Sequence, residues 1–344
     1  MTEAFATFKP NGTLAREDRA YVERSFESRA WSTLTANEWV TLLGPRKYGK
    51  SSALVRLRDR LVSGGYACSF IDVQGYGSSE TDYGEFLEWF AESVSIDVGS
   101  LFTPPDKRHR GYVDVWLNSV ISQDVPSTAI FIDEASGVPD AFRTKFFSQL
   151  RAFYNQRGRG GESGQLSSRV VFAFAGTFRP TAMIDNLNSP FNISDEINPD
   201  DLTLEQVLGL ARLGLGNDGE FFGRRAFEET LGQPFYVQHL LAGVQRAGTD
   251  RMAAFEAGLD ELRSGTNAHL EHLVALVKAD PELRRLVPRI LERKLPFRPG
   301  DLVQQYALVS GIARREANRL IPRNPIHALA LEQFLDDDES SQFP

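Results

Sequence analysis

The chain has a single cysteine in 344 residues, so it can form no internal disulfide. That residue, Cys68, lies in the apolar stretch YACSFIDV, where a buried structural thiol is expected rather than a reactive one. Histidine is also scarce, since the five histidines are scattered and, with one thiol, provide no set of zinc ligands. We therefore expect neither a disulfide-stabilised fold nor a zinc enzyme.

Long hydrophobic runs are missing as well. No apolar stretch approaches the roughly 20 residues that a membrane-spanning helix needs. The first residues, MTEAFATFKPNGT, show no basic segment followed by an apolar core, so no secretory signal is expected. The composition, 42% hydrophobic and 24% charged, is typical of a globular protein, and the length allows one large domain with one or two small ones. We expect a cytoplasmic protein without a membrane partner.

Basic residues are outnumbered, with 38 Lys and Arg against 46 Asp and Glu, and positive charge is concentrated in one segment. The formal net charge is -8, which argues against a protein that coats nucleic acid. Residues 281–323 nevertheless contain ten Arg or Lys and four acids, so this segment is +6 and the remainder is -14. Part of that remainder is the acidic run 336–339, which we expect to be a solvated, frayed end.

Apolar runs alternate with helical patterns through the first 200 residues. The expected strands are 38–43, 66–73, 128–132 and 169–176, each continuously apolar. The expected helices are 51–62, 82–94, 111–123 and 139–157, and the composition of 158–168, GRGGESGQLSS, predicts a mobile loop. Strands that alternate with helices predict an α/β fold, with a parallel sheet covered by helices on both faces.

From about residue 200 onward the pattern is helical only. Thr203 and Gln206 match a capping box at a helix start. Further helices are expected at 224–231, 234–247 and 251–263, and residues 266–335 mix short helices with Pro and Gly breaks.

Residues 44–51 read GPRKYGKS, a complete G-x-x-x-x-G-K-[ST] motif between an expected strand and an expected helix. Glycines let backbone N–H groups turn toward phosphates, and the helix N-terminus adds partial positive charge. Lys50 is expected to reach the β/γ-phosphates and the Ser51 hydroxyl to ligate Mg²⁺. The expected nucleotide-binding residues are Gly44, Pro45, Arg46, Lys47, Tyr48, Gly49, Lys50, Ser51 and Ser52. The flanking strand and helix disfavour a chance glycine-rich turn.

The apolar run 128–132 ends in two adjacent acids, Asp133 and Glu134. Asp133 is expected to hold the Mg²⁺ shell through water, and Glu134 to orient and deprotonate the attacking water. An ordinary acidic turn is the alternative, and the phosphate-binding loop upstream disfavours it. No Asn-Lys-x-Asp guanine-reading motif is present, so the expected cofactors are ATP and Mg²⁺.

Three further residues are candidates for the chemistry. Thr177, directly after the expected strand 169–176, is placed to hydrogen-bond the γ-phosphate or the water, with a simple turn residue as the equal alternative. Arg151 and Arg179 are candidates to neutralise charge in the transition state. For each arginine, a surface or structural role stays the other interpretation.

Five short motifs carry a resemblance to a known family. They are Tyr21–Arg24 (YVER), Leu43–Arg46 (LGPR), Ser189–Asn192 (SPFN), Gly232–Phe235 (GQPF) and Pro322–Ile326 (PRNPI). With them, the chain resembles the AAA-like ATPase family in the STAND branch of P-loop ATPases, related to archaeal ATPases and origin-recognition proteins. Two departures stand out: Ser51-Ser52 replaces the usual Thr-Ser, and Asn198-Pro199 interrupts the expected fifth strand.

The resemblance implies a division into parts and two further nucleotide contacts. The implied parts are a P-loop ATPase core at 1–199, a helical lid at 200–265, a winged-helix-like domain at 266–335 and an acidic tail at 336–344. It also implies that Val22 lies near the adenine and that Pro234 closes on the base. In such proteins ATP draws the lid and the winged helix onto the core, and hydrolysis releases them.

We therefore expect an ATP-hydrolysing molecular switch that regulates a protein partner, in a bacterial signalling or defence system. No effector segment is recognisable, so we expect that partner to be a separate protein, and ATP-dependent self-association is a further expectation. The alternative is an ATP-dependent DNA-binding protein, origin-recognition or transposition-regulator-like, that uses the basic segment 281–323. A nucleotide-binding scaffold without turnover is a third interpretation, which Lys50 and Glu134 disfavour.

Overall fold

The computed structural model describes residues 6–15, 17–76, 82–100, 104–105, 111–121, 127–184, 188–264 and 267–341. The chain divides into two units. The sheet unit comprises Ser25–Leu43 and Lys50–Pro199, and the C-terminal unit comprises Met1–Arg24, Gly44–Gly49 and Asp200–Pro344. The division falls inside the phosphate-binding motif, between Gly49 and Lys50.

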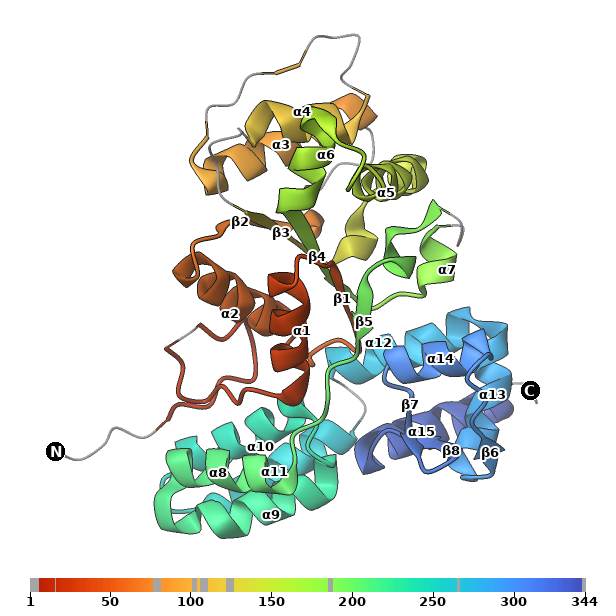
Figure 1. Cartoon of the computed structure of the whole chain (residues 1–344). Coiled ribbons are helices and arrows are strands. Elements are labelled where there is room, and N and C mark those ends of the chain that lie inside the picture. Colours follow the sequence, from red (N-terminus) through yellow and green to blue (C-terminus); the bar gives the residue numbers. More distant parts are fainter. Residues whose placement is uncertain are drawn as a thin grey trace, which may run out of the picture. The chain divides into compact units, whose positions relative to one another are not determined.

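Five parallel strands in the order β2-β3-β4-β1-β5 form the centre of the sheet unit (Figure 1). They are β1 Val40–Leu43, β2 Ala67–Asp72, β3 Thr128–Asp133, β4 Val170–Gly176 and β5 Asp195–Ile197. Both β3 and β4 are buried over their full length, as continuous apolar runs predict. The fifth strand has only three residues because Pro199 lacks an N–H for the ladder. The Asn198 amide bonds the carbonyl of Leu43 instead, at 2.8 Å.

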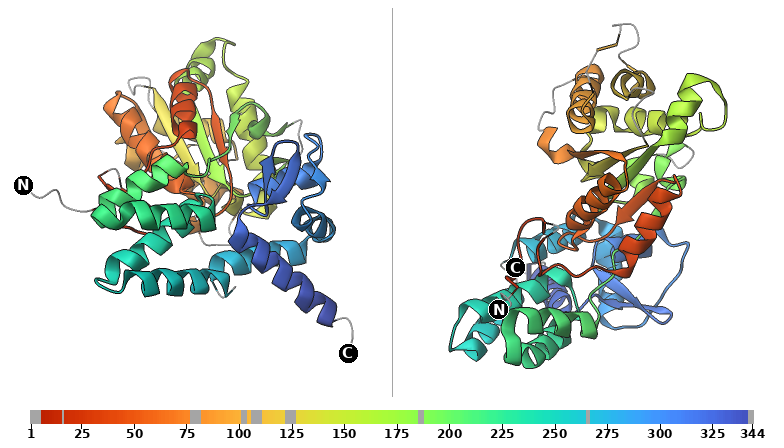
Figure 2. Two further views of the ribbon diagram at one scale, coloured as in Figure 1. Left: turned by 90° about the horizontal axis from the view of Figure 1, so that it is seen from below. Right: turned by 60° about the vertical axis from the view of Figure 1, so that its left-hand side comes forward.

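Helices cover both faces of this sheet (Figures 1 and 2). The pair α1 Ser25–Thr35 and α2 Lys50–Ser63 packs together on one face. The other layer contains α3 Tyr83–Val98, α4 Val113–Val120, α5 Asp140–Tyr154 and α6 Gly161–Arg169. Shorter turns are η1 Val73–Tyr76, η3 Ala135–Gly137, α7 Pro180–Met183 and η5 Pro190–Asn192. The predicted α/β fold with a parallel sheet covered on both faces is thus confirmed.

The prediction of a mobile loop at 158–168 is wrong, because Gly161–Arg169 forms α6. Gly158 and Gly160 lie in the turn before the helix, where Gly160 is the N-cap residue with φ 73°. The helix is anchored by burial of Leu166 and of Ser167, whose hydroxyl donates to the carbonyl of Phe153 at 2.5 Å.

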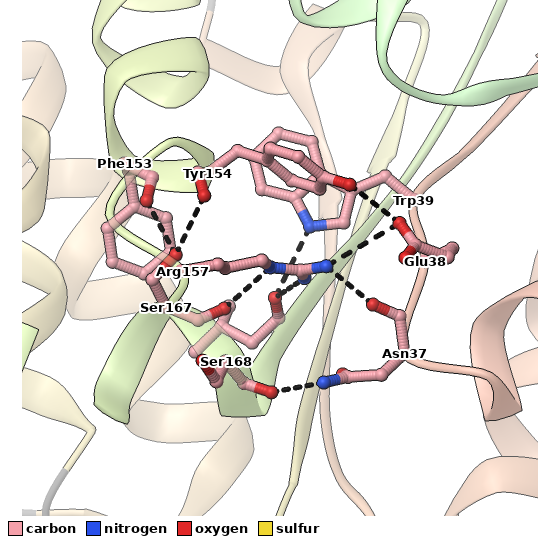
Figure 3. Close-up of polar contacts among 9 residues, drawn as sticks. Asn37, Glu38, Trp39, Phe153, Tyr154, Arg157, Ser167 and Ser168 are labelled. Carbon is pink, nitrogen blue, oxygen red and sulfur yellow. Dashed lines mark hydrogen bonds and ion pairs between the residues drawn. The ribbon is translucent and has the colours of Figure 1, made fainter. Parts of the chain in front are cut away.

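Arg157 ties the amino ends of β1 and β4 to the end of α5 (Figure 3). Its guanidinium donates to the backbone carbonyls of Asn37 at 2.6 Å, Ser167 at 3.0 Å and Val170 at 2.9 Å. It also lies 4.3 Å from the ring centre of Tyr154. A planar guanidinium with five donors can bond three separate carbonyls at once. Arg157 therefore stabilises the amino-terminal ends of β1 and β4, at the opposite end of these strands from their carboxyl ends.

The first part of the C-terminal unit is a group of four helices, called the lid below. They are α8 Leu204–Leu215, α9 Gly219–Thr230, α10 Pro234–Arg246 and α11 Arg251–Arg263, with the turn η6 Gly216–Asp218 after α8. Both bonds of the predicted capping box between Thr203 and Gln206 are present, at 2.9 and 3.2 Å. The apolar faces of the lid helices share one core with Phe8 and Ala20.

The second part of the unit is called the winged-helix-like module below. It contains α12 Ala268–Ala279, α13 Pro281–Leu291, α14 Leu302–Val309 and α15 Pro325–Ser341. Its antiparallel sheet has the order β6-β8-β7, from β6 Leu295–Pro296, β7 Ala313–Glu316 and β8 Arg319–Pro322. Helices packed on a small antiparallel sheet resemble a winged helix, as expected.

The frayed acidic end predicted at 336–339 is wrong, since α15 continues through it to Ser341. The helix is anchored upstream by Leu331 and Phe334, which lie in the core of the winged-helix-like module. Helix formation propagates cheaply from an anchored segment, so the helix can continue through this run. Among the helices described here, none combines the length and hydropathy needed to cross a bilayer.

Candidate nucleotide site

In the sheet unit, Lys50 and Thr177 lie together at the carboxyl end of β4. Lys50 is the first residue of α2, is 5% exposed, and donates from Nζ to the Thr177 hydroxyl at 3.2 Å. Thr177 follows β4 directly. The N-terminus of α2 adds partial positive charge beside this ammonium group. The arrangement is suited to an anionic ligand such as a phosphate group.

Asp133, at the end of β3, is bound to the serine of the phosphate loop. Its carboxylate accepts hydrogen bonds from the Ser51 hydroxyl and from the N–H of Glu134, the latter at 3.0 Å. Burial raises the pKa of Asp133, while these hydrogen bonds and the charge of Lys50 act in the opposite direction. Asp72 ends the neighbouring strand in register with Asp133 and adds to the upward shift.

The donor set at Ser51 and Asp133 fits Mg²⁺. A carboxylate and a hydroxyl are hard oxygen ligands, and Mg²⁺ usually takes only one or two protein oxygens together with phosphates and waters. Within the described residues no cluster of three or more His, Cys, Asp or Glu suited to a metal ion is found. A Mg²⁺ site made largely by nucleotide and water is consistent with both observations.

Glu134 has an unusual backbone conformation. It follows β3 with φ 47° and ψ 51°, in the left-handed region, and is partly buried. Placing a non-glycine residue there costs about 1 kcal/mol or more, and such strain is often found at functional positions. This outlier supports a role for Glu134 beyond that of an ordinary turn residue.

The two candidate arginines have different surroundings. Arg151, in α5, donates to the carbonyl of Ser189 at 3.1 Å and so supports the SPFN turn. Phe191 of that turn packs on Phe147 at a ring-centre distance of 5.0 Å. Arg179 is partly buried at the N-cap of α7, two residues beyond Thr177. Arg151 thus has a structural contact, and the catalytic role of either arginine stays a prediction.

In the C-terminal unit, residues 44–49 of the phosphate loop are held from outside by a buried arginine. Arg24, the last residue of the YVER motif, donates to the carbonyl of Tyr48 at 2.7 Å and to that of Asp200 at 2.8 Å. Gly49 has φ 74°, and a Cβ there would lie 3.0 Å from the Arg24 guanidinium. The glycine is therefore needed both for the turn and for this close approach.

The Tyr48 side chain is fully buried and is not exposed for a nucleotide to contact. Its hydroxyl accepts a hydrogen bond from Arg323 Nε at 2.7 Å, and Arg323 forms an ion pair with Asp201 at 2.6 Å. Sequence reasoning missed the side-chain contacts of Tyr48 and the parts played by Arg24, Asp201 and Arg323. The sequence offered one signal for these contacts. Arg24 belongs to the YVER motif and Arg323 to the PRNPI motif, and the resemblance assigns neither arginine a role.

The start of α10 carries the GQPF motif next to the phosphate loop. Gln233 caps this helix by accepting from the N–H of Tyr236 at 2.6 Å, and Pro234 is its first residue. Lys47 Nζ lies 4.9 Å from the ring centre of Phe235. Val22 is partly buried against the lid core. Val22 and Pro234 thus both belong to the lid part of the unit, and their contacts with the base stay predictions.

Two buried histidines lie near this motif. His327 is fully buried, with Nδ1 2.8 Å from the carbonyl of Gly311 and Nε2 3.0 Å from the Tyr236 hydroxyl. His269 is 7% exposed, with its ring centre 5.5 Å from that of His327. Burial lowers the pKa of His327 to about 4 and that of His269 to about 3, so both are neutral at neutral pH.

Comparisons with known sequences give one partial match. No protein-family model matches the chain. An uncharacterized WD repeat-containing protein of Synechocystis is 29% identical over 259 residues, which are 70% of this chain and 21% of that protein. The chain therefore spans about a fifth of the length of the curated relative it matches.

Solved structures give the clearer likeness. The Walker-type ATPase of Pyrococcus abyssi aligns over 94% of this chain and 98% of its own, with a TM-score of 0.67 and 17% identity. The Cdc6 protein of Pyrobaculum aerophilum aligns over 93% and 97%, with a TM-score of 0.45 and 14% identity. On the first of these likenesses, this chain has the AAA-like P-loop ATPase fold.

Proposed function

We propose that this chain binds and hydrolyses ATP with Mg²⁺ and acts as a nucleotide-operated switch for a protein partner. The observation that carries the proposal is the cluster of Lys50, Thr177, Ser51 and Asp133 at the start of α2 and the ends of β3 and β4. Parallel α/β sheets bind ligands at the carboxyl ends of their strands. A buried cation beside hydroxyl and carboxylate oxygens suits a nucleotide phosphate with its metal ion.

Each residue has a separate task in the proposed reaction. Lys50 Nζ holds the terminal phosphate, with the Thr177 hydroxyl as its neighbour. Ser51 and Asp133 would hold the Mg²⁺, which supplies charge neutralisation for the phosphate oxygens. Water attacks the γ-phosphorus, the bond to the bridging oxygen of ADP breaks, and Glu134 accepts the proton of the water.

A protein partner is favoured over DNA by the contacts of the winged-helix-like module. Helix α14, which precedes the β7–β8 hairpin, reads LVQQYALV and carries no positive charge. Two arginines of the hairpin make contacts inside the module. Arg314 forms an ion pair with Glu316 at 2.8 Å, and Arg315 lies 4.8 Å from the ring centre of Phe297. Phosphate binding by this surface would have to compete with these contacts.

The Synechocystis relative suggests what kind of partner to look for. Its name refers to WD repeats, and the matched residues are only 21% of its length. We infer that the switch acts on a protein module, supplied by a second chain or by a longer polypeptide. ATP-dependent self-association and a role in bacterial signalling or defence belong to the same proposal. DNA binding through the basic segment 281–323 is the second candidate, supported by the exposed Arg315 and Arg319.

The proposal is tested by the change Glu134→Gln, which keeps the shape of the side chain and removes its basicity. Steady-state phosphate release should fall at least roughly 100-fold, the usual scale for loss of a general base, while ATP affinity stays near that of wild type. The matched control is Glu196→Gln, at an exposed position of β5, which should keep full turnover. Turnover of Glu134→Gln within a few-fold of wild type would show that another residue activates the water.

A further inference from the structure

The winged-helix-like module contacts the phosphate loop directly, inside the C-terminal unit. Pro45 and Tyr48 of the loop are both buried. A Cβ added at Gly311, just before β7, would lie 2.9 Å from the Cβ and Cγ of Pro45. Gly311 has φ 84°, and its carbonyl is held by His327 at 2.8 Å. The backbone of the module at Gly311 therefore packs closely against Pro45, the second residue of the motif.

The contact at Tyr48 is more specific, because it is made by a charged group. Arg323 follows β8, and its side chain is only 12% exposed. Its Nε donates to the Tyr48 hydroxyl at 2.7 Å, and its guanidinium carbon lies 4.8 Å from the centre of the same ring. Asp201 fixes the other side of the guanidinium at 2.6 Å. Charge-assisted hydrogen bonds of this kind are stronger and shorter than neutral ones.

These contacts form a closed circuit of hydrogen bonds and covalent bonds that begins and ends at Tyr48. From the Tyr48 hydroxyl the path runs to Arg323 and then to Asp201. Asp201 is covalently joined to Asp200, whose carbonyl accepts from Arg24 at 2.8 Å. Arg24 returns to the Tyr48 carbonyl at 2.7 Å. Both the side chain and the peptide of Tyr48 are therefore fixed by residues that lie outside the motif.

We propose that Tyr48, Arg323, Asp201 and Arg24 form a latch through which the winged-helix-like module sets the shape of the phosphate loop. Phosphate binding depends on where the loop N–H groups point, and Tyr48 directly precedes Gly49 and Lys50. Arg323 and Tyr48 are thus positioning residues. The inference rests on the proposed ATP binding.

The latch has a thermodynamic consequence. If the module raises the affinity of the loop for nucleotide by some factor, then nucleotide must stabilise the docked module by the same factor. A partner that pulls the Arg323 segment away would therefore weaken nucleotide binding without touching the nucleotide. The latch gives the proposed switch a defined route between its partner and its phosphate loop.

The first arm of the test uses nucleotide-free protein. Tyr48→Phe removes only the hydroxyl, and Arg323→Gln removes the charge that bonds it. Arg319→Gln is the matched control, an exposed arginine on β8 outside the latch. Amide hydrogen exchange across 44–49 should be faster in the two latch variants and unchanged in the control. Unchanged exchange in folded latch variants overturns the latch, whether or not the protein binds ATP.

The second arm measures ATP affinity by calorimetry. Each latch variant should lose several-fold and up to about tenfold in affinity, since the strength of one charge-assisted hydrogen bond sets the upper limit of the coupling. The double variant should lose less than the sum of the two single losses, because both changes break the bond between Arg323 and the Tyr48 hydroxyl. ATP should also protect residues 311–327 from exchange in wild type and less so in the variants. Wild-type ATP affinity in both variants, or fully additive losses, overturns the latch.

The two arms separate the latch from the function on which it rests. A wild-type protein that fails to bind ATP overturns the proposed function, and the exchange measurement across 44–49 still decides the latch. A wild-type protein that binds ATP tightly, with variants that bind equally well, overturns the latch alone. The melting temperature of each variant serves as the folding control.

Discussion

Lowering the pH from 7 to 5 is expected to destabilise the C-terminal unit, because His327 and His269 are held neutral in the folded chain. Both rings are buried, and burial lowers their pKa values to about 4 and about 3, from an ordinary value of 6.5. A histidine whose pKa is depressed by folding contributes its full stability above the unfolded pKa. That stability is lost as the pH falls toward the folded values, since the unfolded chain then binds more protons.

The size of the effect follows from the two pKa values. Between pH 7 and pH 5 each histidine should lower the free energy of unfolding by about 2 kcal/mol, because the unfolded ring is protonated in this window while the folded ring is not. Domains are typically stable by only about 5–15 kcal/mol, so the change should be easily measured. The rings lie 5.5 Å apart, so their titrations are coupled and the two losses need not add.

Urea unfolding at pH 7, 6 and 5 measures the prediction. His327→Gln keeps a polar side chain but cannot titrate, so it should be less stable at pH 7 and lose about 2 kcal/mol less than wild type on going to pH 5. Leu331→Ala is the control, a fully buried position of the same module that leaves both histidines intact. It should lower stability equally at every pH. A wild-type pH slope in His327→Gln would refute the reasoning that this ring is held neutral by burial.

Three further predictions concern other parts of the chain. Lys50→Ala should lose ATP affinity by about tenfold or more without unfolding, since it removes a charge-assisted contact to phosphate, and calorimetry would detect unchanged binding. Arg157→Ala should destabilise the fold by about 2–3 kcal/mol, because the carbonyls of Asn37 and Ser167 lose this donor and that of Val170 keeps the Trp39 indole N–H. Arg157→Lys should recover little of this, as urea unfolding can show. DNA retention should be weak, should collapse between about 50 and 200 mM salt, and should not depend on ATP. Tight, ATP-dependent retention that Arg314→Glu/Arg315→Glu abolishes would make DNA the leading partner.

The parts of the fold that were predicted correctly depend on local patterns. The strands β3 and β4 are buried, nearly continuous apolar runs, and α8 begins at a capping box that the residue types alone predict. The composition of 158–168 does not predict α6, because glycine content describes the whole segment and not the position of each glycine. Its glycines lie in the turn before the helix and at its first residues, and the helix depends on burial of Leu166 and Ser167, which composition does not reveal.

In the candidate site, too, the residues that belong to local motifs could be predicted, and contacts between residues far apart in the sequence could not. Lys50, Ser51 and Asp133 were found because their motifs have a fixed spacing and a fixed context of strand and helix. The bond between Tyr48 and Arg323 joins residues 275 positions apart, and no local pattern reports such a pair. Arg323 is also the last of the ten basic residues in the segment 281–323, so composition alone predicts one more solvated charge. Only the tertiary structure shows that its side chain is mostly buried, with 12% exposed.

The lid core has a consequence for the order in which the chain can fold during synthesis. Phe8 and Ala20 share that core with the four lid helices, and the N–H of Ala6 bonds the carbonyl of Leu213 at 2.9 Å. Residues 6–20 are synthesised before the lid helices and can be buried in this core only once residues beyond 200 are present, while the sheet unit between them has its own core. A fragment that starts at residue 200 would leave the lid core open where Phe8 packs. We expect such a fragment to expose apolar surface and to aggregate.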